Sequence, residues 1–186
     1  RNAKATDTYI LKGEGVETWE PKFTYHGFRY VQVEGLPHAP KVGDIRVKIV
    51  RNAVAPVGKF HCSNELLNRI HRMVVATEAS NLHGVPTDCP QRDERMGWLN
   101  DLTVRIEQAV YNFDFSRFYA KFIDDIADTQ HEDGTITCVA PYRFGARPAD
   151  PVSASYLLLA WKSYEYYGNR NIIRDHYDGL KGWVDY

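Results

Sequence analysis

The segment from Asp88 to Asp101 gathers side chains that could carry out acid–base chemistry. Five of the eight residues from Asp88 to Arg95 are charged, and Pro90 lies among them. With the indole of Trp98, the segment places carboxylates, guanidiniums and an aromatic face in one short connection between two helical patterns. Unpaired charges are costly to bury, so this connection cannot be core. Charged loops held by rigid elements are frequent sites of chemistry.

Three carboxylates in this segment suggest glycoside hydrolysis. Asp88, Glu94 and Asp101 are separated by 6 and 7 residues. That reaction needs two carboxyl groups across the scissile bond, one of them protonated so that it can act as a general acid. For Asp101 the simpler interpretation is helix capping, because a carboxylate at a helix start gains from free N–H groups and from the helix dipole. A second structural alternative is an ion network that pins the loop through its own charges: Asp88, Arg92, Asp93 and Arg95.

Two further kinds of site can be built from the sequence, and both are weaker. Cys89 with a histidine such as His83 would give a nucleophile and its base, but no oxyanion element is visible beside them. A metal site would have to combine residues whose spacings do not match structural zinc patterns: His61, Cys62, His131 and Cys138. We therefore expect neither a metal nor a cofactor. The odd number of cysteines, 3, also argues against a disulfide framework.

The composition excludes some classes of protein. Lys plus Arg number 23 and Asp plus Glu number 24, a net charge of −1 that gives no electrostatic footprint for nucleic acid. No apolar run approaches the roughly 18 residues that a membrane span needs. Hydrophobic residues make up 44% of the 186 residues, enough for a packed core. The aromatic content of 13% favours a large aromatic core, and a sugar-stacking surface is the alternative.

The first 52 residues predict β-structure. Apolar and charged residues alternate over 45–49, with the period of a half-buried strand. Residues 28–33 are rich in aromatic and β-branched side chains, and residues 8–11 form a third short candidate. Three strands are too few for an independent two-layered domain. We therefore interpret residues 1–52 as the last strands of a β-sandwich domain plus a linker.

Residues 53–186 predict amphipathic helices arranged as hairpins. Ser63 is a good N-cap for the first helix, and Gly168 marks the end of the fourth. Apolar residues recur at helical spacing in five stretches: 66–77, 102–113, 115–126, 153–167 and 173–184. Because the patterns at both ends of the sequence look interrupted, we expect this chain to be part of a longer one.

The charged segment also resembles a known signature. Asp88-Cys-Pro-Gln-Arg-Asp-Glu-Arg95, followed by Gly97-Trp98 and Asp101, is similar to the motif of the bacterial α-L-rhamnosidases of glycoside hydrolase family 78. The motif is long, ungapped and rich in rare residue types. The stretch from Gly15 to Gly35, with Tyr25-His26-Gly27-Phe28-Arg29-Tyr30, resembles the β-sandwich strands that precede the catalytic domain in that family. The resemblance covers most of the chain.

This resemblance implies a mainly α fold, in which residues 53–186 form the first helical hairpins of an (α/α)6 barrel. It implies an inverting reaction on terminal α-L-rhamnose, in which Glu94 gives its proton to the leaving oxygen. The family's sugar contacts fall on four residues of this chain: Asp88, Arg92, Trp98 and Asp101. The carboxylates would accept sugar hydroxyls, the guanidinium would supply fixed donors, and the indole would face the ring or its methyl group. The expected partner is a rhamnosylated glycoside or polysaccharide.

Two departures from the family pattern concern the sugar. The family often reads Gly-Trp-Thr-Gly-Asp where this chain has Gly97-Trp98-Leu99-Asn100-Asp101. In the loop from Ala140 to Pro151 it often has a tryptophan followed by an Asp-Ala pair, and here Asp150-Pro151-Val152 stands instead. A missing indole would change one wall of the subsite. An inverting hydrolase of the same barrel type on another sugar, or a non-catalytic carbohydrate-binding homologue, therefore stays an alternative.

The general base of this family lies in a later helix of the barrel, and no residue of this sequence matches it. The rest of a longer chain would be needed to complete the barrel. We therefore expect that the 186 residues alone do not hydrolyse glycosides. Turnover of an aryl rhamnoside by the purified 186-residue chain would contradict this expectation.

Overall fold

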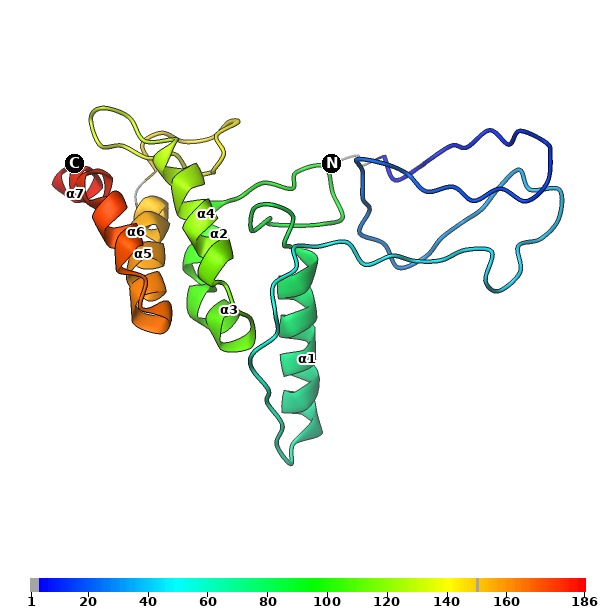
Figure 1. Ribbon diagram of the computed structural model, residues 1–186, viewed down its shortest axis with the longest axis horizontal. Helices are drawn as coiled ribbons and strands as arrows, with labels where there is room; N and C mark the ends of the chain where they lie inside the picture. Colours follow the sequence, from blue (N-terminus) through cyan, green and yellow to red (C-terminus); the bar gives the residue numbers. More distant parts are fainter. Residues whose placement is uncertain (1–3, 150) are drawn as a thin grey trace.

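A computed structural model describes residues 4–149 and 151–186, and it confirms that the chain is mainly helical. Asp150, part of the altered loop noted above, lies outside the described residues. Figure 1 shows helices α2 to α7 gathered together, with α1 beside them and residues 4–50 reaching away on the far side of α1. None of the described helices is both long enough and apolar enough to cross a membrane.

Residues 4–52 differ from the sequence prediction, because none of the three predicted strands is assigned as a strand. No strand is assigned anywhere in residues 4–149 or 151–186. The alternating residues Ile45, Val47 and Ile49 are all exposed. A strand is defined by its backbone partners as much as by its own residues. The alternation therefore predicts the extended conformation, and the pairing would have to come from neighbouring strands.

Helix α1 (Glu65–Ser80) is attached to the other helices through polar contacts and through the packing of Val75 and Ala79 against the core. Its N-cap is Asn64, whose side chain accepts a hydrogen bond from the Leu66 N–H, so the prediction of Ser63 was wrong by one residue. Glu78 is buried and pairs with Arg105 at 3.0 Å. The apolar stripe of 66–77 lies largely on the exposed side, as its three largest members show: Leu66, Ile70 and Met73.

The predicted helix over 102–113 is divided in two. Helix α2 (Leu99–Thr103) and helix α3 (Ile106–Asn112) are separated at Val104 and Arg105. Arg105 leaves helical geometry, with φ −120° and ψ 0°, and its guanidinium turns to the buried carboxylate of Glu78. The break and the ion pair therefore occur at the same residue. The apolar positions of the stripe are buried as predicted: Leu102, Ile106, Ala109 and Phe113.

Helix α4 (Ser116–Ala127) forms the centre of the core and packs against α5 (Ser155–Tyr167). Its predicted stripe is buried throughout: Phe115, Phe118, Tyr119, Phe122, Ile123 and Ile126. A short 3-10 helix, η1 (Val152–Ala154), leads into α5, which ends at Gly168 in the left-handed conformation. The predicted fifth helix is two helices, α6 (Arg170–Asp175) and α7 (Tyr177–Asp185).

The charged loop joins this core through a short antiparallel pairing. The Ala140 N–H donates to the Gly97 carbonyl and the Leu99 N–H donates to the Cys138 carbonyl, both at 3.0 Å. Trp98 faces Val139 in the resulting bridge. A Cβ built on Gly97 would lie 2.3 Å from the Ala140 carbonyl oxygen, so only glycine allows the two backbones to approach this closely.

Gly97→Ala is expected to destabilise the protein by about 1–3 kcal/mol, because the obstacle is backbone that cannot rotate away. Gly182→Ala in α7 is the matched control: a Cβ there meets nothing closer than 3.9 Å, and alanine favours a helix. Thermal unfolding of both variants checks the expectation. Equal unfolding midpoints would contradict the packing described at Gly97.

Candidate active site

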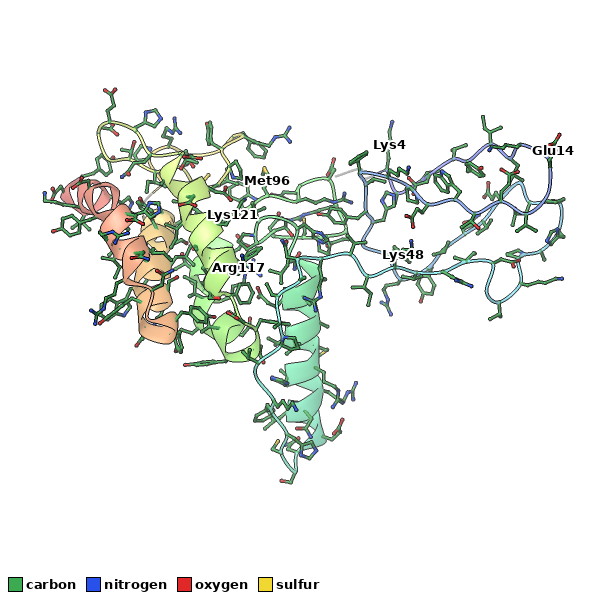
Figure 2. The ribbon with its side chains drawn as sticks, viewed as in Figure 1. Lys4, Glu14, Lys48, Met96, Arg117 and Lys121 are labelled. Atoms are coloured by element: carbon green, nitrogen blue, oxygen red, sulfur yellow. The ribbon has the colours of Figure 1, made fainter. Side chains whose placement is uncertain are left out.

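The loop from Asp88 to Met96 is closed at its base. The Asp88 N–H donates to the Met96 carbonyl at 3.0 Å, and the Met96 N–H donates to Asp88 Oδ1 at 2.9 Å. Met96, labelled in Figure 2, lies where the loop reaches the helices and is buried. The two bonds tie both ends of the loop together, so the charged residues between them are held as one unit.

The guanidinium of Arg92 is shared by three side chains of this loop. Its Nη2 lies 3.2 Å from Asp88 Oδ2 and 2.9 Å from Glu94 Oε2, and its Nε donates to the Cys89 Sγ at 3.2 Å. The hydrogen bonds to Cys89 and Asp88 raise the pKa of Arg92 further above its already high ordinary value. One fixed cation therefore lies against two carboxyl groups that are each almost buried, with side chains 5% and 6% exposed.

Asp88 is held as a carboxylate by its surroundings. Burial alone would raise its pKa, but the combined hydrogen bonds from the Cys89 side chain, the Met96 N–H and Arg92 outweigh it. The pKa of Asp88 is therefore below its ordinary value. A carboxylate that accepts several hydrogen bonds is stabilised in its charged form. Asp88 thus supplies a permanent negative charge that fixes Arg92 in place.

Glu94 is oriented by an indole on its other side. Trp98 Nε1 donates to Glu94 Oε1 at 2.9 Å, while Arg92 lies against Oε2. Trp98 is itself fixed by the backbone bridge to Val139 and by the edge of the Phe144 ring, whose centroid is 6.0 Å away. Both carboxyl oxygens of Glu94 therefore have a defined neighbour.

Asp101 lies apart from this cluster. It is exposed in the first turn of α2, and it makes no hydrogen bond or ion pair with another described residue. The N-cap of α2 is Trp98, and its cap has no side-chain hydrogen bond, so Asp101 does not cap the helix. It lies in the first turn, where the helix dipole favours a carboxylate. The structure brings four predicted residues into contact, Asp88, Arg92, Glu94 and Trp98, and leaves the fifth on the neighbouring helix.

The predicted ion network is only partly formed. Asp88 and Arg92 pair as described, but Asp93 is exposed without an ion pair among the described residues. Arg95 turns away from the acids and lies over the ring of Tyr25, 4.3 Å from its centroid. Sequence reasoning missed this contact and the thiol of Cys89 in the cluster. Neither has a local signal, since Tyr25 is distant in the sequence and a lone cysteine is uninformative.

The competing sites receive no geometric support. Cys89 is buried and bonds to Arg92, while the His83 ring nitrogen bonds to the Ser80 carbonyl, so the two do not form a nucleophile–base pair. Within the described part of the chain, one group offers three potential metal ligands within 4.8 Å of one another: Asp88, Cys89 and Glu94. Arg92 already contacts all three, so a cation of the protein itself lies against this position.

Two open cavities occur on other parts of the surface. One of about 550 Å³ is lined from α5 to α7 by Tyr164, Arg170, Ile173, Arg174 and Tyr177. The other, of about 630 Å³, is lined by residues 128–133 and Arg147. Neither cavity is lined by a residue of the charged loop.

Comparison with known proteins shows the family of this chain. Residues 55–186 match the model of the bacterial alpha-L-rhamnosidase 6 hairpin glycosidase domain, and residues 1–51 match that of the bacterial alpha-L-rhamnosidase concanavalin-like domain. The chain belongs to the bacterial α-L-rhamnosidases. An alpha-L-rhamnosidase of Streptomyces avermitilis is 37% identical over all of this chain. The helical fold predicted above thus corresponds to the start of a six-hairpin domain.

Solved rhamnosidase structures have the same fold. The structure of the enzyme from Dictyoglumus thermophilum is 47% identical and superposes on 89% of this chain and 19% of that chain, with a TM-score of 0.87. The Streptomyces avermitilis enzyme, in a crystal structure with L-rhamnose, is 34% identical and covers 95% of this chain and 17% of that one, with a TM-score of 0.90. The chain spans 18% to 20% of the length of the curated rhamnosidases that it matches.

The lowered pKa of Asp88 predicts how its contribution to stability depends on pH. A carboxyl group with a depressed folded-state pKa stabilises the fold above its unfolded pKa, about 4, and this contribution is lost as pH falls through the folded value. The unfolding midpoint of Asp88→Asn should therefore lie below the wild-type value from pH 7 to about pH 5, with a gap that narrows below about pH 4. Asp93→Asn, exposed in the same loop, should show no gap. A gap that stays constant into acid would contradict the assigned ion pair.

Proposed function

We propose that the charged loop is the acid half of the active site of an inverting α-L-rhamnosidase, with Glu94 as the general acid. The observation that carries the proposal is the setting of Glu94: its side chain is 6% exposed, and its two oxygens lie against the Trp98 indole and the Arg92 guanidinium. A general acid must hold its proton at one defined place in order to deliver it to the leaving oxygen. The two neighbours fix the orientation of the carboxyl group.

The other four residues are proposed to bind the sugar. The Arg92 side chain is about half exposed, so it can donate to a sugar hydroxyl while it stays bound to Asp88. A carboxylate has about four lone-pair sites, which leaves acceptor capacity on Asp88. Asp101 is exposed on α2 and available as a further acceptor, and the partly exposed indole of Trp98 offers an apolar face.

The second catalytic carboxyl group is proposed to come from outside this segment. Inverting hydrolysis needs its two carboxyl groups about 6.5–9.5 Å apart, so that a water fits on the far side of the sugar. Asp88 offers an oxygen within 4.8 Å of Glu94, which is too close for that spacing. We infer that the general base belongs to a further part of a longer chain, which also completes the barrel, and that the division between the two domains lies near residue 52.

The substrate is proposed to be a terminal α-L-rhamnosyl group on a glycoside or polysaccharide. The names of the relatives and the L-rhamnose in the Streptomyces avermitilis structure support this choice. One observation favours a second candidate, an inverting hydrolase for another sugar. The loop that follows Val139 places Phe144, 52% exposed, against Trp98, in the loop where the family often has an indole.

Glu94→Gln in the full-length enzyme tests the assignment of the acid. Glutamine keeps the hydrogen bond from Trp98 but has no proton to give, so kcat on a phenyl rhamnoside should fall roughly 10²- to 10⁴-fold. Binding of rhamnose, measured by calorimetry, should persist. The control is Glu14→Gln, because Glu14 is exposed at the far end of the extended region in Figure 2. Unchanged turnover in Glu94→Gln would refute the proposal, and a wild type that binds sugar without turnover would favour the non-catalytic alternative.

The stereochemistry of the first product tests the mechanism. Inversion predicts that β-L-rhamnose appears first, and that the α anomer follows by mutarotation. Proton NMR during the first minutes of hydrolysis distinguishes the two. Initial release of the α anomer would overturn inversion and would point to Asp88 as a nucleophile. The same assay with a panel of aryl glycosides identifies the preferred sugar.

A further inference from the structure

Arg95 adopts a backbone conformation that is rare for its residue type. Its φ is +51°, in the left-handed region that residues with a Cβ seldom occupy. Glu94 is directed to Trp98 and Arg92, whereas the next side chain is directed to the segment around Tyr25. The backbone turn at Arg95 therefore directs Glu94 toward Trp98 and Arg92, and directs the Arg95 side chain toward the segment around Tyr25.

The Arg95 side chain completes a three-layer stack. Its guanidinium carbon lies 4.3 Å from the centroid of the Tyr25 ring, and the ring stacks in turn on His83, with centroids 3.9 Å apart and planes 15° apart. The three residues come from the extended region, from the loop of the acid and from the turn after α1. The ring of Tyr25 is thus the only connection in the stack between the other two layers.

The charges in this stack favour the same arrangement. Burial lowers the pKa of His83, and the nearby Arg95 charge lowers it further, so at neutral pH the imidazole carries no charge to repel the guanidinium. The Arg95 Nε is buried without a hydrogen-bond acceptor among the described residues. The π face of Tyr25 is a direct partner of this cation, and such contacts gain strength when they are desolvated.

The backbone beside Tyr25 also lies against the acid loop. A Cβ built on Gly27 would meet the backbone of Pro90 and Gln91 at 3.0 Å. No side chain separates the two segments at that point. The Tyr25–Gly27 segment thus contacts the loop twice, at its middle through Gly27 and at its end through Tyr25.

We propose that Tyr25 is a positioning residue for the general acid: by holding Arg95 in its left-handed conformation, the concanavalin-like region fixes the orientation of Glu94. This inference rests on the proposed function of Glu94. Tyr25 touches neither the acid nor the sugar in this proposal, and it acts through Arg95 alone. Without the ring, the loop relaxes at Arg95, and the carboxyl group of Glu94 no longer meets the leaving oxygen.

The test compares two rhamnosides on the full-length enzyme. A phenyl leaving group needs its proton from the general acid, whereas a 2,4-dinitrophenyl group departs as a stable anion and needs little help. Tyr25→Ala should lower kcat on the phenyl substrate at least roughly tenfold more than on the dinitrophenyl substrate, with KM changed little. Tyr25→Phe keeps the ring and should restore the wild-type ratio. Tyr25→Leu fills the space without a π face and should behave as the alanine variant does.

Tyr30→Ala is the matched control. Tyr30 lies in the same region and has its own cation–π contact with Arg29 at 5.9 Å, but it is 84% exposed and does not contact the loop. It should leave both rates unchanged. The ratio of the two rates does not depend on the folded fraction, so a loss of stability cannot imitate the expected result.

Three outcomes decide the inference. A selective loss on the phenyl substrate in Tyr25→Ala and Tyr25→Leu, rescued in Tyr25→Phe, supports it. Equal losses on both substrates, or none, overturn it, provided that Glu94→Gln shows the selective loss. If Glu94→Gln also fails to discriminate between the substrates, the proposed function of Glu94 falls, and the role of Tyr25 falls with it.

Discussion

The short pairing of Gly97–Leu99 with Cys138–Ala140 is the contact on which the rest of the candidate site depends. It attaches a hydrophilic loop to an aromatic core by two backbone hydrogen bonds, and the missing side chain of Gly97 lets the two segments meet. Because Trp98 lies within the pairing, its indole is attached to the core. The indole N–H donates a hydrogen bond to Glu94 and so restrains this side chain, although Glu94 lies at the end of a loop rather than on a helix.

Charge in the loop is arranged so that each group has a separate task. Arg92 contacts two nearly buried carboxyl groups, which offsets part of the cost of placing them side by side. Asp88, held ionised by its hydrogen bonds, serves as an anchor, and Glu94 is oriented by Trp98 and Arg92. Arg95 is directed elsewhere by its backbone. The charged residues of this segment thus form two groups: Arg92 with Asp88 and Glu94, and Arg95 with the ring of Tyr25.

Features set by local periodicity could be predicted, and features set by distant partners could not. The buried stripe over 115–126 follows from its spacing alone, and the cluster of Asp88, Arg92, Glu94 and Trp98 follows from a compact motif. The break at Arg105 could not be foreseen, because it depends on Glu78 of another helix. The predicted strands failed for a related reason, since alternation describes one strand while pairing requires two. The left-handed backbone conformation of Arg95 and its contact with Tyr25 could not be predicted either, because no local sequence pattern indicates them.

The close contact of Gly27 with the backbone of Pro90 and Gln91 affects which chimeras of related proteins can fold. A crossover near residue 52 separates Gly27 and Tyr25 from the loop that they contact. A chimera joined there takes the two sides of a tight interface from different parents, and neither side has a flexible side chain that could absorb a mismatch. Exchange of the first region between relatives should therefore succeed where the facing loop is transferred with it.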